Sequence, residues 1–170
     1  FVACKDSTAT TADTCNPNGS RVAVIKDKQV AFYINLAFSN ASNLVINQDK
    51  LFVICSGTFN SGFNEDGAIV EINLSDISNN PTPKTVAQNK SFGQLEFAND
   101  KAFSGNLGNG QLIKYDTTTL PWTVECNKTF TNKIGLAFIS DIKFYNASNC
   151  IYATEYNSNK LYKLETNKFE

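Results

Sequence analysis

Histidine and methionine are both missing from this chain of 170 residues. Histidine is the commonest general base in enzymes and the commonest neutral metal ligand, so its absence removes both roles from any chemistry that the chain performs alone. Without a methionine, residue 1 is not an initiator. We therefore expect the chain to be processed or excised from a longer precursor.

Charge is scarce as well. Only 18% of the residues are charged, and the net charge at pH 7 is −1. A pI near 5.5 excludes a nucleic-acid-binding protein of the basic-patch kind, because such proteins bind phosphate through a local excess of Lys and Arg. No apolar run approaches the roughly 18 residues of a membrane span, so none is predicted. The hydrophobic share of 42% excludes intrinsic disorder.

Five cysteines are present, with no Cys-x-x-Cys spacing and no His to complete a zinc site. The sequence therefore predicts no metal and no cofactor. One or two disulfides and a leftover thiol are expected, and the spacing does not fix their connectivity. Either of two pairs could form one, Cys4 and Cys15, which flank one loop, or Cys126 and Cys150, on neighbouring expected strands. Cys55 would then be a buried, small apolar residue. No Cys has a His partner, so no nucleophilic role is predicted.

Asparagine is abundant, with 22 residues. Six of them open an Asn-x-Ser/Thr sequence, which predicts either N-glycosylation of an exported protein or asparagines that form turns. The six are Asn18, Asn40, Asn73, Asn89, Asn127 and Asn146.

The sequence repeats with a period of about fifty residues. Each copy reads small, polar, apolar, any residue, apolar, then a turn with Asn or Asp, then an apolar–aromatic strand. The copies pair 42–46 with 51–54, 93–97 with 102–104, and 140–144 with 151–154.

A third strand follows in every copy, at 67–73, 110–116 and 159–165. Its apolar residues alternate in the same register in all three copies, which is typical of a β-strand. Asn109-Gly110 precedes the second of these strands and suits a type I′ hairpin turn. A fourth run, at 84–87 and 122–126, closes the first two copies.

Four short antiparallel strands per repeat predict an all-β protein built of β-propeller blades. The expected blades are 1–40 (partial), 41–90, 91–135 and 136–170 (partial), about three and a half in a single segment 1–170. Because propellers close with four to eight blades, we expect an arc of a larger propeller or a ring completed by several chains. A β-sandwich is the alternative, although it does not predict the repeat.

Three segments resemble the YVTN repeat, which has the form apolar-Tyr-Val-Thr-Asn, a loop, and a strand that ends in an acidic residue. They are 51–54, 151–155 and 160–166. Glu155 stands where the repeat has Asn, and 104–106 keeps only the Asn. The resemblance to this family of YncE-like and surface-layer-associated β-propellers implies a propeller fold in a secreted, cell-surface or periplasmic protein.

The amino end has two interpretations. Phe1-Val2-Ala3-Cys4 matches Phe52-Val53-Ile54-Cys55 at the repeat offset, which predicts the second strand of a partial blade. A small residue before Cys4 and a Ser/Thr-rich run after it also fit the end of a lipoprotein signal, with lipidation of Cys4. The repeat favours the first interpretation.

Three polar residues open the innermost strands at equivalent positions, namely Asn43, Gln94 and Asp141. We expect them to line the axial face of the propeller, at the mouth of the channel, and to contact a ligand or an ion. The alternative is that they hydrogen-bond the turn backbone. Asp116 and Glu165 end equivalent strands and are interpreted as repeat features, not as a catalytic pair.

Two further features have a ligand-binding and a structural interpretation. The loop 60–67 is rich in oxygen ligands but lacks the distal Glu of an EF-hand, so a solvated hairpin loop is predicted in preference to a calcium site. Trp122 is predicted to pack inside a blade and not to form a sugar platform.

These patterns predict a non-catalytic extracytoplasmic propeller that acts as a binding or structural surface. Its expected partner is another protein or a surface polymer, bound through the axial loops, or further copies of itself. One alternative is part of a propeller enzyme, of the lactonase or hydrolase type, whose catalytic residues lie outside this segment. Another is a subunit of a homopolymeric surface or filament assembly.

Overall fold

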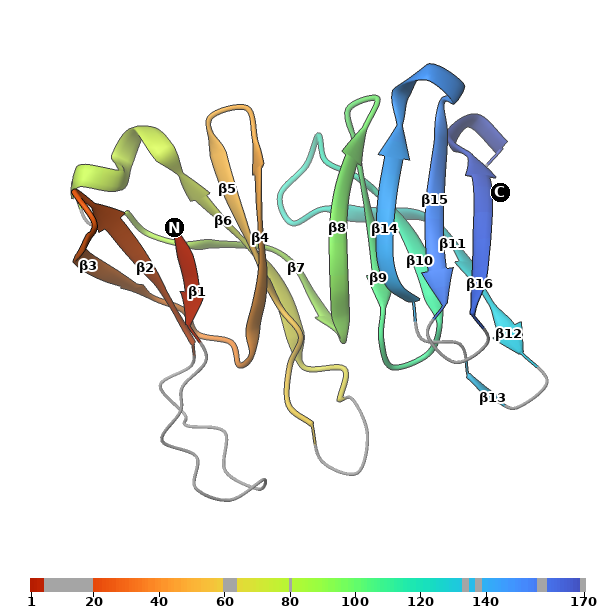
Figure 1. Ribbon diagram of the computed structural model, residues 1–170, viewed down its shortest axis with the longest axis horizontal. Helices are drawn as coiled ribbons and strands as arrows, with labels where there is room; N and C mark the ends of the chain where they lie inside the picture. The colour runs from red at the N-terminus through yellow and green to blue at the C-terminus, as the bar shows by residue number, and fades with distance from the viewer. Residues whose placement is uncertain are drawn as a thin grey trace. The chain divides into compact units, whose positions relative to one another are not determined.

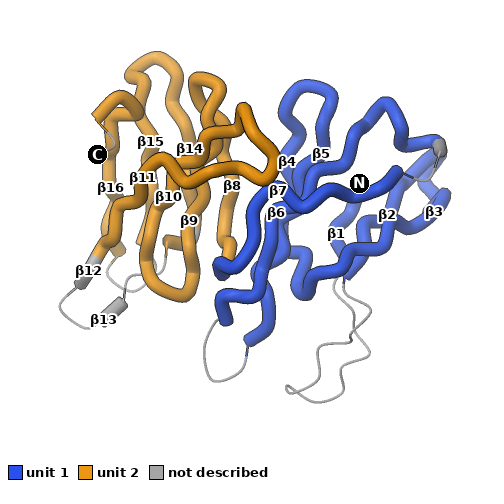
Figure 2. Tube along the Cα trace, turned by 180° about the vertical axis from the view of Figure 1, so that it is seen from behind, with its two compact units in different colours: residues 1–91 blue, residues 92–170 orange. Residues whose placement is uncertain are grey.

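The computed structural model describes residues 1–4, 20–59, 64–79, 81–132, 135–136, 139–155 and 159–168 (Figure 1). Within these residues the regular structure is strands and short 3-10 turns, and the strands form antiparallel sheets. The predicted all-β class with sheets of three or four antiparallel strands is therefore confirmed. The chain divides into two compact units, 1–91 and 92–170 (Figure 2), and each is described by itself.

Unit 1 contains two sheets in which strands pair in chain order. The three-stranded sheet consists of β1 (Val2–Cys4), β2 (Arg21–Lys26) and β3 (Gln29–Asn35). The four-stranded sheet consists of β4 (Ala41–Asn47), β5 (Lys50–Cys55), β6 (Gly67–Asn73) and β7 (Lys84–Lys90), with the 3-10 turn η1 (Leu74–Asn79) after β6. Apolar residues from both sheets form one core, which includes Val22, Ile34, Leu51, Val53, Val70 and Ile72.

Unit 2 has the same organisation. Its four-stranded sheet consists of β8 (Phe92–Ala98), β9 (Lys101–Asn106), β10 (Gln111–Asp116) and β11 (Thr123–Thr129). Its three-stranded sheet consists of β14 (Ile139–Tyr145), β15 (Cys150–Glu155) and β16 (Lys160–Glu165), with the 3-10 turns η2 (Asn146–Ser148) and η3 (Thr166–Lys168). The short hairpin β12 (Thr131–Asn132) and β13 (Gly135–Leu136) joins them. The core includes Phe103, Leu112, Ile139, Ile142, Ile151 and Ala153.

Every predicted strand segment falls on an observed strand, because period-two alternation matches a sheet with a buried face. An alternating pattern requires only one buried face, but the middle strands of the four-stranded sheets are buried on both faces. Ile69 and Val70 lie on opposite faces of β6, and both are buried. Strands of this kind need neighbours on both faces.

Left-handed residues close several hairpins. The two-residue turns Asp27-Lys28 and Asn99-Asp100 have positive φ at both positions, 51° and 65° in the first and 50° and 59° in the second, as type I′ turns require. The prediction of such a turn at Asn109-Gly110 was wrong. The connection runs over 107–110, and of the two residues only Gly110 has a positive φ, 65°. The longer connection removes the need for a second left-handed residue.

A repeated hydrogen bond joins the hairpin turn before the second strand to the residue after the third strand. Leu74 N donates to Asp49 O at 2.9 Å, and Thr166 N donates to Asn149 O at 3.1 Å. At the equivalent place the Thr117 hydroxyl donates to Asp100 O at 2.9 Å. The repeat thus extends from strand order to individual loop contacts.

Candidate functional site

The three predicted site residues lie at equivalent backbone bulges. The first strand of each sheet, β4, β8 and β14, shifts register against its partner, between Ala41 and Asn43, between Phe92 and Leu95, and between Ile139 and Asp141. A bulge inserts an extra residue on one strand and turns the neighbouring side chains away from the regular pleat. Asn43, Gln94 and Asp141 therefore occupy one structural position, repeated three times.

Two of these side chains bind the backbone of the bulge. The amide oxygen Oδ1 of Asn43 accepts a hydrogen bond from Leu44 N at 2.8 Å. One carboxylate oxygen of Asp141 accepts the same bond from Ile142 N at 2.9 Å. Asp141 is exposed, whereas Asn43 and Gln94 are half-buried. Asn43 and Asp141 thus hydrogen-bond the backbone, as the alternative interpretation expects, and the Asp141 side chain is also exposed to solvent.

The structure brings two of the three residues to one place. In unit 2, β14 lies against β8. A Cβ placed on Gly93, beside Gln94, would lie 3.2 Å from the backbone oxygen of Ile139. The bulged starts of β8 and β14 are therefore adjacent, and Gln94 and Asp141 lie at the same end of unit 2. Asn43 belongs to unit 1.

A group of serines surrounds the equivalent bulge in unit 1. The hydroxyl oxygens of Ser42 and Ser56 are 2.8 Å apart, and the Ser91 hydroxyl donates to Ser56 O at 3.1 Å. Ser20 Oγ accepts a hydrogen bond from Ala41 N at 2.9 Å. These serines satisfy polar backbone groups around the bulge. Sequence reasoning missed them, although the small residue that opens each repeat, Ser42 in this copy, was the available signal.

In the β4–β7, β8–β11 and β14–β16 sheets the second strand ends in a buried residue, and this residue differs between the three sheets. Cys55, Asn106 and Glu155 face the first residues of β4, β8 and β14, and are 0%, 0% and 2% exposed. Asn106 Oδ1 accepts a hydrogen bond from Gly108 N at 2.8 Å. The Tyr162 hydroxyl donates to the Glu155 carboxylate at 3.3 Å. Burial raises the pKa of the Cys55 thiol to about 12.

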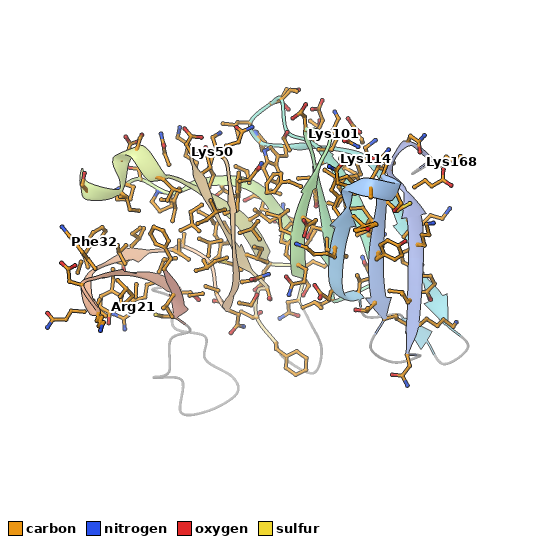
Figure 3. The ribbon with its side chains drawn as sticks, turned by 45° about the horizontal axis from the view of Figure 1, so that its top comes forward. Arg21, Phe32, Lys50, Lys101, Lys114 and Lys168 are labelled. Carbon is orange, nitrogen blue, oxygen red and sulfur yellow. The ribbon has the colours of Figure 1, made fainter. Side chains whose placement is uncertain are left out.

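Ion pairs connect β9, β10 and β11 in unit 2 through Lys101 and Lys114, both labelled in Figure 3. Lys101 binds Glu125 and lies 3.3 Å from Asp116, and Lys114 lies 3.0 Å from Glu125. Hydrogen bonds from Lys101 and then Lys114 lower the pKa of Glu125. The pKa of Asp116 is lowered first by Thr118 and then by Lys101. These are surface pairs that stabilise the sheet modestly.

Asp116 and Glu165 each have local partners. The Asp116 carboxylate accepts a hydrogen bond from Thr118 N at 3.0 Å. Glu165 pairs with Lys168 at 2.8 Å, and the hydrogen bond from Lys168 lowers the pKa of that carboxyl. The two residues lie in different sheets, β10 and β16.

The predicted disulfide between Cys126 and Cys150 was wrong, because neither residue is disulfide-bonded. Cys126 lies on β11, the outer strand of one sheet, and Cys150 opens β15, the middle strand of another. Strands that are close in the sequence here belong to separate sheets. The Cys150 thiol donates to Ser148 O at 3.1 Å. Cys4 is not disulfide-bonded either. Cys15 lies outside the described residues, and the lipidation of Cys4 stays a prediction.

The Asn-x-Ser/Thr asparagines fall into two groups. Asn89, Asn127 and Asn146 are exposed, whereas Asn40 and Asn73 are half-buried and hydrogen-bonded. The Asn40 amide donates to Gly57 O, and Asn73 Oδ1 accepts from Ser75 N at 3.1 Å. Asn40 and Asn89 have φ of 56° and 63°, a region that asparagine tolerates well. Asn18 lies outside the described residues.

The 60–67 loop and Trp122 have structural partners. Asp66 accepts hydrogen bonds from the Thr58 backbone N–H and hydroxyl, both at 2.7 Å, which occupies its carboxylate. Residues 60–63 lie outside the described part. Among the described residues there is no group of three or more His, Cys, Asp or Glu able to hold a metal ion. Trp122 is 7% exposed and packs edge-on against Phe97, with ring centroids 5.9 Å apart.

Comparison with known proteins leaves the chain without an assigned family. No protein-family model matches it. No curated protein matches it either. In the described part of the chain, no helix has the length and apolar character needed to cross a membrane.

Proposed function

We propose that this chain is a non-catalytic β-propeller segment that serves as a binding or structural surface outside the cytoplasm. The observation that carries the proposal is the bulge repeated at the start of β4, β8 and β14, which gives Asn43, Gln94 and Asp141 one structural position. Polar side chains recurring at the same end of successive blades are suited to bind a protein or a surface polymer.

Strand order supports blades over a sandwich. Within each sheet of three or four strands, neighbouring strands are consecutive in the chain. A Greek-key sandwich requires strands that leave one sheet for the other. The first strands β8 and β14 also lie together in unit 2, as the innermost strands of adjacent blades do.

The chemistry of the bulge residues indicates the ligand class. Two amides and one exposed carboxylate offer hydrogen-bond donors and acceptors with little net charge. Such groups recognise hydroxyls and backbone amides better than they recognise phosphates, which need Lys or Arg. We therefore infer a polysaccharide or an extended peptide as the ligand.

The first test uses an array of purified cell-surface polysaccharides and synthetic peptides. We expect the triple variant Asn43→Ala, Gln94→Ala, Asp141→Ala to lose at least about tenfold in affinity for probes that bind the wild-type chain, equivalent to about 1.4 kcal/mol. The control variant carries the same three changes at exposed positions outside the bulges of β4, β8 and β14, Gln88→Ala, Asp76→Ala and Asn127→Ala, and should bind as the wild type does. Unchanged binding of the first variant, or no binding of any probe by the wild type, contradicts the proposal.

A further inference from the structure

The Asn-x-Ser/Thr tripeptides differ in how the fold presents them to an enzyme. Attachment of a sugar needs the asparagine side-chain nitrogen Nδ2 at the surface, and the transferase also recognises the hydroxyl of the third residue. Five of the tripeptides lie wholly within the described residues. They begin at Asn40, Asn73, Asn89, Asn127 and Asn146.

The tripeptide at Asn40 is closed at both reactive groups. Asn40 Nδ2, the atom that would bond to the sugar, donates a hydrogen bond to Gly57 O. The Ser42 hydroxyl oxygen lies 2.8 Å from that of Ser56 and 3.3 Å from Ile54 O. A sugar on Asn40 would therefore displace a contact that holds the segment after β5.

The tripeptide at Asn73 is folded back on itself. Asn73 Oδ1 accepts hydrogen bonds from the Ser75 N–H at 3.1 Å and the Ser75 hydroxyl at 3.0 Å. The middle residue, Leu74, packs against the core of unit 1, and its N–H donates to Asp49 O at 2.9 Å. An enzyme cannot draw out this segment without unfolding the end of β6.

The next two tripeptides form a matched pair, because 85–92 and 123–130 share Thr-Val-x-x-Asn-Lys-Ser/Thr-Phe. In β7, Asn89 is exposed, but it lies at a register shift against β6 and has a φ of 63°. Ser91, its third residue, is 0% exposed, and the Ser91 hydroxyl donates to Ser56 O at 3.1 Å. The group that a transferase recognises is therefore buried.

The same local sequence is open in β11. Asn127, Lys128 and Thr129 pair with β10 in regular register, and all three residues are exposed. β11 is also the outer strand of its sheet, so an enzyme can approach this tripeptide from the side. Since the two sequences match, the difference between Asn89 and Asn127 comes from the fold.

The tripeptide at Asn146 is open as well. Asn146, Ala147 and Ser148 form the turn η2, and all three are exposed. The backbone oxygen of Asn146 accepts a hydrogen bond from Asn149 N at 3.1 Å, and that of Ser148 accepts one from the Cys150 thiol at 3.1 Å. These bonds fix the turn through its backbone and leave its side chains at the surface.

We propose that Asn127 and Asn146 are the N-glycosylation sites of the folded chain and that Asn40, Asn73 and Asn89 are not. The sugar donor is a sugar diphosphate carried by a nucleoside or a polyprenol. A bond forms between Nδ2 and C1 of the sugar while the C1–O bond to the diphosphate breaks. The diphosphate leaves with the electron pair, and the amide gives up one proton. This inference rests on the proposed location outside the cytoplasm, because such glycans are typical of exported proteins.

Sugar transfer to the purified, folded chain tests the assignment. The reagents are UDP-glucose and a soluble asparagine glucosyltransferase that modifies free peptides covering 84–92 and 122–130. Mass spectrometry of proteolytic fragments gives the rate at each asparagine, and each rate is divided by that of a free peptide of the same sequence. This ratio removes the intrinsic difference between Ser and Thr in the third position. The ratio should be at least about tenfold lower at Asn40, Asn73 and Asn89 than at Asn127 and Asn146, because a closed site reacts only after local unfolding.

Three variants complete the test. Asn127→Gln and Asn146→Gln should each lose one hexose, whereas Asn89→Gln, the matched control, should keep both. Equal ratios at Asn89 and Asn127 overturn the proposal, and so does a folded chain that accepts no hexose at Asn127 or Asn146. The array of polysaccharides and peptides uses chain that carries no sugar, so the ligand-binding proposal and this one can each fail alone.

Discussion

At the scale of single residues, one buried position accepts three different groups. Cys55, Asn106 and Glu155 all end the second strand of their sheets and are nearly inaccessible. The amide and the carboxylate each have a hydrogen-bond partner there. The thiol needs none, because an uncharged Cys behaves as a small apolar residue. Its burial instead affects its ionisation.

Cys55 makes the stability of the fold depend on alkaline pH. Its pKa rises from 9.0 to about 12 on folding, so below pH 9 both states hold the proton and stability is unaffected. Above pH 9 only the unfolded state loses the proton, and the free energy of unfolding falls by about 1.4 kcal/mol per pH unit until pH 12. Urea denaturation at pH 8, 9.5 and 10.5 should show a shallower decline in Cys55→Ala than in the wild type. Burial also raises the pKa of Tyr115, so the variant keeps part of the decline. Equal slopes would contradict the prediction.

At the scale of strands, the first strands β4, β8 and β14 contain bulges, and the third strand β6 begins where backbone segments approach closely. Gly67 opens β6 where three segments converge. A Cβ at this position would collide with the backbone oxygen of Cys55 and lie 2.6 Å from that of Lys90. Backbone atoms held by sheet hydrogen bonds do not move away at small cost, so only glycine fits.

Gly67→Ala should therefore destabilise the chain by about 3 kcal/mol, by the overpacking of backbone against backbone. Gly93→Ala is the comparison, because its added Cβ would lie 3.1 Å from Leu107 Cδ2, a side-chain atom that is able to shift, and 3.2 Å from the backbone oxygen of Ile139, a looser approach than either backbone oxygen makes at Gly67. Its cost should be about 1 kcal/mol or less. Thermal and urea unfolding measure both variants. A Gly67→Ala variant as stable as the wild type would show that the third strand does not approach this closely.

The sequence predicted the strands better than their irregularities. Alternation located strands such as β6 and β10 because burial of one face imposes period two on composition. A bulge leaves no comparable mark, so the shift between Ala41 and Asn43 was not foreseen. The pairing of Cys126 with Cys150 failed because it joined residues of two successive sheets, which the expected boundary between residues 135 and 136 already separated. A clearer marker was present, since 85–92 and 123–130 share Thr-Val-x-x-Asn-Lys-Ser/Thr-Phe and mark the fourth strand of each complete sheet.

At the scale of the whole molecule, the exposure of a strand depends on its place within its sheet and on the place of that sheet in the chain. All residues of β5 except Lys50 are buried, as are all residues of β9 except Lys101. In β16, by contrast, exposed and half-buried residues alternate. Burial therefore decreases from the second strands β5 and β9 to the exposed strand β16.

Hydrogen–deuterium exchange should reproduce this gradient. We expect amides of β5 and β9 to exchange slowest and those of β16 and β3 fastest among the strands, because local opening costs least where few apolar contacts are lost. Mass spectrometry of peptic peptides gives the order. Protection of β16 equal to that of β5 would contradict the gradient.

Because each of the four main sheets is formed by strands that follow one another directly, almost every ladder contact joins residues close in the chain. Closing the short hairpin loops between neighbouring strands costs little entropy. A sheet can therefore form as soon as its own strands have left the ribosome, without waiting for the carboxyl end. We expect folding to proceed sheet by sheet, with the second sheet of each unit condensing on the first to form their shared core.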